Sequence, residues 1–180
     1  MKERANAELD HAVREALIEL HQRVCSDWSG RERELVSLFA FGYLATFFSA
    51  DNAILKAQAQ IGIEVAVKQT GHLESMKTQV CKDLVVWREP AMTAWDGQWQ
   101  LNRTPLCVMQ WKCITPLTVA RVNKKTVLAP DVDWLKKFTE QNNDCIGFSV
   151  LADLRPNPRC IACDRFESGT QAEDWLVLSG

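Results

Sequence analysis

The sequence predicts an α/β protein in which a central mixed sheet is flanked by helices. Three observations lead to this class. Apolar residues recur at helical spacing over residues 5–24 and 30–48, and strand-like apolar runs follow in the middle of the chain. A further helical segment then separates the third of these runs from the fourth. Because two parallel strands need such a crossover, the sheet should contain a parallel pair.

Two helices are expected before the first strand. One face of residues 5–24 is aliphatic and the opposite face is charged. The second helix, 30–48, begins where Ser29 and Glu32, three residues apart, fit a capping box. Its apolar run, 35–48, would span about 21 Å as a helix, which is too short for a bilayer core of about 30 Å. We therefore expect a buried helix there and a soluble protein.

The rest of the chain alternates between strands and one helix. Strand character is found at 61–67, 83–87, 105–114 and 145–151. A short helix is expected over 131–142, with Pro130 at its start. Residues 155–164 read as a loop or an edge strand, and 174–178 as a last strand. Asp96-Gly97 is a hairpin turn signal that would place Trp95 and Trp99 on one face, either to cover the sheet edge or to stack on bases.

Composition predicts one folded domain, 1–180, in a reducing compartment. The 180 residues carry 21 Lys and Arg against 23 Asp and Glu, so no overall basic character indicates nucleic acid. Seven cysteines, an odd number, with no secretory signal favour free thiols and a cytoplasmic protein. We divide the domain into an N-terminal helix and loop (1–29), a core (30–152) and a C-terminal edge segment (153–180).

Three polar residues on two successive strands could carry chemistry. Asp83 begins one strand, and Gln110 and Lys112 lie two apart on the next, so these two project to the same face. If the strands are neighbours, the three side chains can converge. Carboxylate and amide oxygens suit Mg²⁺, and a nearby lysine can orient an attacking water and neutralise phosphate charge.

With these residues the sequence resembles the PD-(D/E)XK nuclease superfamily, which has a restriction-endonuclease-like fold. The resemblance covers roughly residues 30–152 and includes the expected order of elements, α-β-β-β-α-β, after an extra N-terminal helix. It implies a metal-dependent nuclease that hydrolyses phosphodiester bonds with Mg²⁺ or Mn²⁺, and we expect its substrate to be DNA and not RNA. Asp83, Gln110, Lys112 and Glu32 would be catalytic, and Asp83, Gln110 and Glu32 would hold the metal. Lys82 replaces a proline that is common in the family, and Gln110 replaces the commoner acid.

Other interpretations stay open at this point. The accessory acid could be Glu32 or Glu34, on the helix before the first strand, or Glu64, within the strand expected at 61–67. A capping role would explain Glu32 by itself. The loss of a charge at Gln110 allows a catalytically inactive domain that binds nucleic acid or protein. Cys160-x-x-Cys163 allows a zinc or redox protein, although a structural zinc site needs four ligands. The N-terminal helix could complete the core or form a subunit contact, as in a homodimer.

Overall fold

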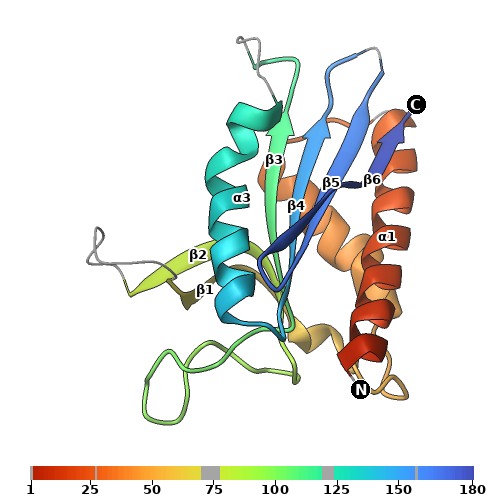
Figure 1. Cartoon of the computed structure of the whole chain (residues 1–180). Coiled ribbons are helices and arrows are strands. Elements are labelled where there is room, and N and C mark those ends of the chain that lie inside the picture. Colours follow the sequence, from red (N-terminus) through yellow and green to blue (C-terminus); the bar gives the residue numbers. More distant parts are fainter. Residues whose placement is uncertain (1, 27, 70–77, 119–123, 157) are drawn as a thin grey trace.

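The computed structural model describes residues 2–26, 28–69, 78–118, 124–156 and 158–180 and contains an open six-stranded sheet (Figure 1). The strands follow one another across the sheet in chain order: β1 (Ile61–Lys68), β2 (Gln79–Val86), β3 (Cys107–Ile114), β4 (Ile146–Asp153), β5 (Cys160–Glu167) and β6 (Thr170–Ser179). β3 and β4 run parallel, and the other four neighbouring pairs are antiparallel. The predicted mixed sheet is therefore confirmed, with its parallel pair on either side of the predicted crossover helix.

Helices cover both faces of the sheet. α1 (Lys2–Ser26), α2 (Glu32–Ser37) and the irregular helical turns after it bury aliphatic residues in one core together with β3, β4 and β5. α3 (Lys124–Gln141) packs on the opposite face through a smaller core. The aliphatic stripe of α1 is fully buried within the chain, so this helix completes the core.

The second predicted helix is real, but it is not regular. α2 begins at Glu32 and ends at Ser37; a π-helical turn (Leu38–Tyr43) and a 3₁₀ turn (Leu44–Phe47) follow it. The chain leaves α-helical geometry at Tyr43, where φ is −126° and ψ is −61°. π-helical turns are uncommon in proteins and are often found beside functional sites. The apolar run 35–48 is nevertheless anchored in the core, where Phe39, Ala40 and Leu44 are fully buried, as its composition predicts.

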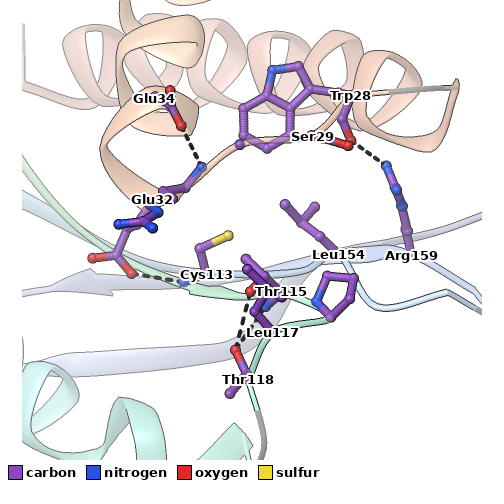
Figure 2. Close-up of a pocket in the computed structure, with 13 residues that line it drawn as sticks. Trp28, Ser29, Glu32, Glu34, Cys113, Thr115, Leu117, Thr118, Leu154 and Arg159 are labelled. Carbon is purple, nitrogen blue, oxygen red and sulfur yellow. Dashed lines mark hydrogen bonds between the residues drawn. The ribbon is translucent and has the colours of Figure 1, made fainter.

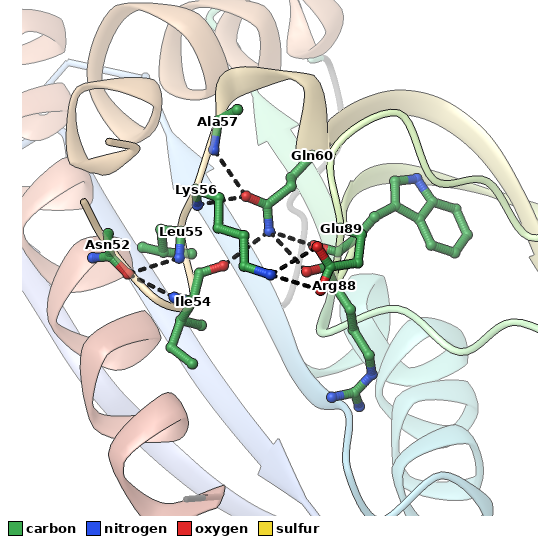
Figure 3. A network of polar contacts seen from close by, with 9 residues as sticks. Asn52, Ile54, Leu55, Lys56, Ala57, Gln60, Arg88 and Glu89 are labelled. Atoms are coloured by element: carbon green, nitrogen blue, oxygen red, sulfur yellow. Dashed lines mark hydrogen bonds and ion pairs between the residues drawn. The ribbon is translucent and has the colours of Figure 1, made fainter. Parts of the chain in front are cut away.

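A buried amide fastens the connection between these turns and β1. Gln60 is fully buried; its Oε1 accepts from the N–H groups of Lys56 and Ala57, and its Nε2 donates to the carbonyls of Ile54 and Trp87 (Figure 3). Lys56 also pairs with Glu89 at 2.7 Å. Because Trp87 directly follows β2, this network joins the start of β1 to the end of β2.

Several predicted elements have other limits. α3 begins at Lys124 and contains Pro130, which the sequence places at the helix start. β5 pairs with both β4 and β6, so residues 160–167 form an interior strand and not a loop or an edge. Asp164 and Arg165 interrupt the apolar pattern of this strand. Asp164 is buried and Arg165 half-buried, and hydrogen bonds such as that from Arg165 to Asp10 satisfy their polar groups.

The Asp96-Gly97 turn forms without a hairpin of two strands. The Asp96 carboxylate accepts the N–H groups of Gln98 and Gln100, and a single bridge joins Trp95 to Leu101. Side-chain bonds of this kind support a compact loop in place of a strand ladder. In the parts of the chain that the structure describes, no helix is long and apolar enough to cross a membrane.

The feature that positions the candidate site is the separation of β2 from β3. Their ladder contains three residue pairs, Leu84–Val86 with 107–109, whereas β3 and β4 pair along their whole length. The pairing of β1 with β2 also skips Glu64, whose φ is 52°, and Asp83 opposite it. The side chains on β2 change faces here: Leu84 lies in the α1 core, whereas Lys82, two residues away, contacts α3. Beyond Met109, the edge of β3 is therefore left for side chains to cover.

Candidate active site

Two carboxylates take the place of a strand along the free edge of β3. Asp83 Oδ2 accepts the N–H of Trp111 at 2.7 Å, and Glu32 Oε2 accepts the N–H of Cys113 at 2.8 Å. N–H groups two residues apart on a strand point to the same edge and are separated by about 7 Å. Asp83 from β2 and Glu32 from α2 are therefore neighbours, an arrangement that the family resemblance leads us to expect.

Glu32 is available for this contact because another residue caps α2. The helix begins at Glu32, and Glu34 Oε2 accepts the N–H of the N-cap residue, Arg31, at 2.7 Å. The predicted capping box of Ser29 with Glu32 is therefore wrong, since the helix starts later than the sequence suggests. Glu34 has the capping role. It faces a different cavity from the one beside Asp83.

Glu64 lies beside the two carboxylates but is tied to a cation. A cavity of about 230 Å³ is lined by Glu32, Asp83 and Glu64 together with Arg33. The Glu64 carboxylate is exposed and pairs with Arg33 at 2.7 Å. Its left-handed backbone at φ 52° marks the irregularity opposite Asp83. Glu64 thus belongs to the rim of this cavity.

Lys112 approaches the carboxylates from the side of α3. Its ammonium lies 3.1 Å from Asp131 Oδ2, on a residue that sequence reasoning did not single out. Burial by itself would lower the pKa of Lys112, but the carboxylates of Asp131, Glu32 and Asp83 outweigh it and raise that pKa. Lys112 is therefore a cation at neutral pH, able to donate hydrogen bonds and stabilise negative charge but not to take up a proton.

Gln110 shares the α3 side with Lys112, as predicted, but its amide oxygen is already engaged. Gln110 Oε1 accepts from Lys82 Nζ at 3.2 Å, and Gln110 Nε2 donates to the carbonyl of Met109. The Lys82 ammonium also lies 3.6 Å from the centre of the Trp134 ring. Lys82 and Gln110 are only 4% and 5% exposed. In the sequence, Lys82 stands out only as a substitute for proline; its buried ammonium is a part of the site that the sequence did not predict.

Burial controls the proton affinities of this cluster. It raises the pKa of Glu32 and that of Asp83, and the N–H bonds from β3 and the charge of Lys112 oppose the rise without cancelling it. Burial also lowers the pKa of Lys82 to about 8, although Asp131 and Asp83 act in the opposite direction. Titratable groups perturbed by desolvation and by specific partners are typical of functional sites.

The donor set fits a cation that keeps much of its own water. Within the described parts of the chain, no three His, Cys, Asp or Glu side chains are arranged to hold a metal ion. One carboxylate oxygen of Asp83 and one of Glu32 each accept a hydrogen bond from a backbone N–H of β3. The second oxygen of each carboxylate has no hydrogen bond to any residue that the structure describes. Mg²⁺ is commonly held by one or two carboxylates, with water and substrate phosphate completing its shell. The two carboxylates fit this kind of site.

The other candidates from the sequence lie apart from this cluster. Cys160 and Cys163 are both on β5. Because residues three apart on a strand point to opposite faces, the two thiols cannot coordinate the same metal ion. No disulfide joins any of the seven cysteines. Trp95 and Trp99 have ring centres 6.3 Å apart on the loop after β2, and Trp99 is 79% exposed.

Comparison of the chain with protein-family models, with curated proteins and with solved structures found no match. The resemblance to PD-(D/E)XK nucleases therefore rests on Asp83, Gln110 and Lys112 and on the order of the elements. What the protein does has to be argued from the geometry of the site.

Proposed function

We propose that this protein is a metal-dependent nuclease of the PD-(D/E)XK type, which hydrolyses phosphodiester bonds in DNA with Mg²⁺ or Mn²⁺. The observation that carries the proposal is the grouping of Asp83, Glu32 and Lys112 where β2 separates from β3. The order α2, β1, β2, β3, α3, β4 supports a restriction-endonuclease-like core.

Asp83 and Glu32 would hold the metal through their second oxygens. A bound divalent cation would supply Lewis-acid activation of phosphate and water. Lys112 would orient the attacking water and stabilise the charge of the phosphorane-like transition state. Asp131 keeps the Lys112 ammonium at 3.1 Å and so fixes its position beside the carboxylates. Gln110 would act through Lys82, because its Oε1 accepts a hydrogen bond from the Lys82 ammonium. To hold the metal directly, the amide would have to turn away from Lys82.

A second candidate is the same domain without catalysis, serving to bind nucleic acid or protein. The observation that favours it is that both predicted polar residues of β3 are already partnered, Gln110 by Lys82 and Lys112 by Asp131. Side chains that are already paired within the chain need no metal to hold them in place. The two candidates differ in whether a cation at Asp83 is required.

The test combines calorimetric titration of Mn²⁺ with cleavage of labelled DNA in Mg²⁺. We expect Mn²⁺ to bind the wild type, with higher affinity when a phosphorothioate oligonucleotide is present, because phosphate completes the metal shell. Asp83→Asn keeps an acceptor for the N–H of Trp111 but removes the charge, and should abolish both Mn²⁺ binding and cleavage. Lys112→Met should keep Mn²⁺ binding and slow cleavage about 10²–10³-fold, the usual cost of one lost transition-state donor.

Glu64→Gln is the matched control, because Glu64 lines the same cavity but is exposed and paired with Arg33. It should leave metal binding and cleavage within about twofold of the wild type, since an exposed carboxylate that is paired with Arg33 at the rim contributes little to the binding of the metal. If the wild type binds no Mn²⁺ with or without the oligonucleotide, the nuclease proposal fails. DNA binding that needs no metal and survives Asp83→Asn would establish the second candidate.

A further inference from the structure

A second, more spacious cavity adjoins the candidate site. It has a volume of about 690 Å³ and lies between the start of α2 and the loop after β3. Figure 2 shows Trp28 above it, with Cys113 and Leu154 below and Glu32 and Arg159 on opposite sides. A volume of this size accommodates a small organic ligand, of which a nucleotide is one.

The cavity is built to present the indole ring of Trp28. A Cβ on Gly30 would lie 2.5 and 2.6 Å from two atoms of that ring, so the backbone passes the indole at a distance that only glycine allows. Arg159 fixes the same residue from the other side, since its Nη1 donates to the carbonyls of Val24 and Trp28. Trp28 is therefore held in place, with Leu154 and Pro116 as apolar surface around the cavity.

The polar groups of the cavity favour a base over a phosphate in its interior. The carboxylates of Glu32 and Glu34 line one side and would repel a phosphate. Arg159 lies on the other side, and hydroxyl groups of Thr115 and Thr118 lie near its floor. A flat, uncharged, hydrogen-bonding ring suits an aromatic wall with such donors and acceptors.

Glu32 lines both this cavity and the smaller cavity that contains Asp83. A phosphate beside the carboxylate pair would therefore place the neighbouring nucleotide at the mouth of the larger cavity. We propose that the cavity under Trp28 binds an unpaired nucleobase next to the phosphate that is cleaved, so that the substrate is single-stranded or frayed DNA. This inference rests on the proposed function for the position of the phosphate, but the base-binding cavity itself can be tested without catalysis.

The test is fluorescence anisotropy with a labelled oligothymidine and an abasic oligonucleotide of equal length, in EDTA and at low ionic strength. Trp28→Met keeps apolar bulk but removes the ring. It should weaken oligothymidine binding about tenfold, as expected for the loss of one base stack, and change abasic binding less than twofold. Trp28→Phe should restore most of the affinity. Trp99→Met is the control, because Trp99 is an exposed tryptophan on a separate loop.

The base-binding inference is overturned if Trp28→Met weakens the binding of both oligonucleotides equally or does not change it. It is also overturned if the wild type binds no oligothymidine. Thermal unfolding identifies a variant that is destabilised, and Trp28→Phe then decides the outcome. A duplex of the same sequence should bind more weakly than oligothymidine, and equal binding also counts against an unpaired base. If the wild type does not cleave DNA but Trp28→Met still weakens oligothymidine binding, the nuclease proposal is refuted and the protein is a single-strand binding module. Metal-dependent cleavage without the Trp28 effect would refute only the inference.

Discussion

Lys82 shows how individual side chains are balanced at this site. Its ammonium is buried between Gln110 and the ring of Trp134, and Asp83 and Asp131 lie near enough to favour its charge. Burial nevertheless prevails and brings its pKa to about 8. Burying an ammonium group next to partly buried carboxyl groups lowers the stability of the fold. Proteins keep such destabilising groups mainly where function requires them.

We predict that Lys82→Met removes a pH-dependent part of the free energy of unfolding. Between pH 8 and the normal lysine pKa near 10.4, the unfolded chain binds more protons than the native one at this position, so wild-type stability rises with pH there. The stability of Lys82→Met relative to the wild type should therefore fall by about 3 kcal/mol between pH 7 and pH 10.5. Urea unfolding in EDTA at several pH values measures it.

Lys68→Met is the control for this experiment, because Lys68 is an exposed lysine on the neighbouring strand β1. Lys68→Met gives the baseline for replacing an exposed lysine by methionine over the same pH interval. A Lys82→Met curve parallel to that of the control would mean that Lys82 titrates as an ordinary surface lysine, and the electrostatic account of the cluster would be wrong.

At the residue scale, the sequence located part of the site. Asp83 and Lys112 are predicted from residue type and spacing, and Glu32 from the family resemblance; the structure brings the three together. Asp131 and Lys82 could not be predicted in the same way. Their roles depend on the packing of α3 and on a change of face within β2, both of which are tertiary features. Period-2 alternation places Lys82 with Leu84, and the irregularity at Asp83 breaks that rule.

Among the elements, those with clear apolar periodicity were predicted best. The strands at 61–68, 107–114 and 146–153 agree with the sequence within two residues. The interior strand β5 was missed because Asp164 and Arg165 interrupt its apolar pattern, and their partners on α1 and β6 are distant in sequence. Helix starts were also displaced. α2 begins later than predicted because Ser29 upstream resembles a cap, and α3 begins earlier, at Lys124, because Pro130 resembles a helix start but lies inside the helix.

The start of α2 carries a prediction of its own. Glu34→Ala should lower the free energy of unfolding by about 1 kcal/mol, the usual cost of a lost capping interaction, because the N–H of Arg31 loses its acceptor. Ser29→Ala should change it by less than about 0.5 kcal/mol, because Ser29 is exposed and precedes the helix. Chemical denaturation compares the two variants. The reverse order would restore the capping box that the sequence suggests and place the helix start before Glu32.

At the scale of the whole molecule, the two faces of the sheet have different roles. The α1 face holds the larger core, which includes Trp111 and Phe39 with ring centres 5.0 Å apart. The α3 face supplies Asp131 to Lys112 and Trp134 to Lys82. Glu32 comes from the first face and meets these groups across the gap between β2 and β3. The site therefore exists only when helices on both faces are docked to the sheet.

This dependence predicts that α1 unfolds together with the rest of the chain. Leu17 is fully buried in the larger core, and Leu17→Ala should cost about 2–5 kcal/mol through lost burial and the cavity left behind. Because the cores share one sheet, the transitions followed by tryptophan fluorescence and by far-ultraviolet circular dichroism should shift to lower denaturant together. Glu19→Ala, on the exposed side of α1, should leave both transitions within about 0.5 kcal/mol of the wild type. Separate transitions for the two probes in Leu17→Ala would show that α1 docks onto a sheet that is already stable, and Glu32 would then have to be positioned without its help.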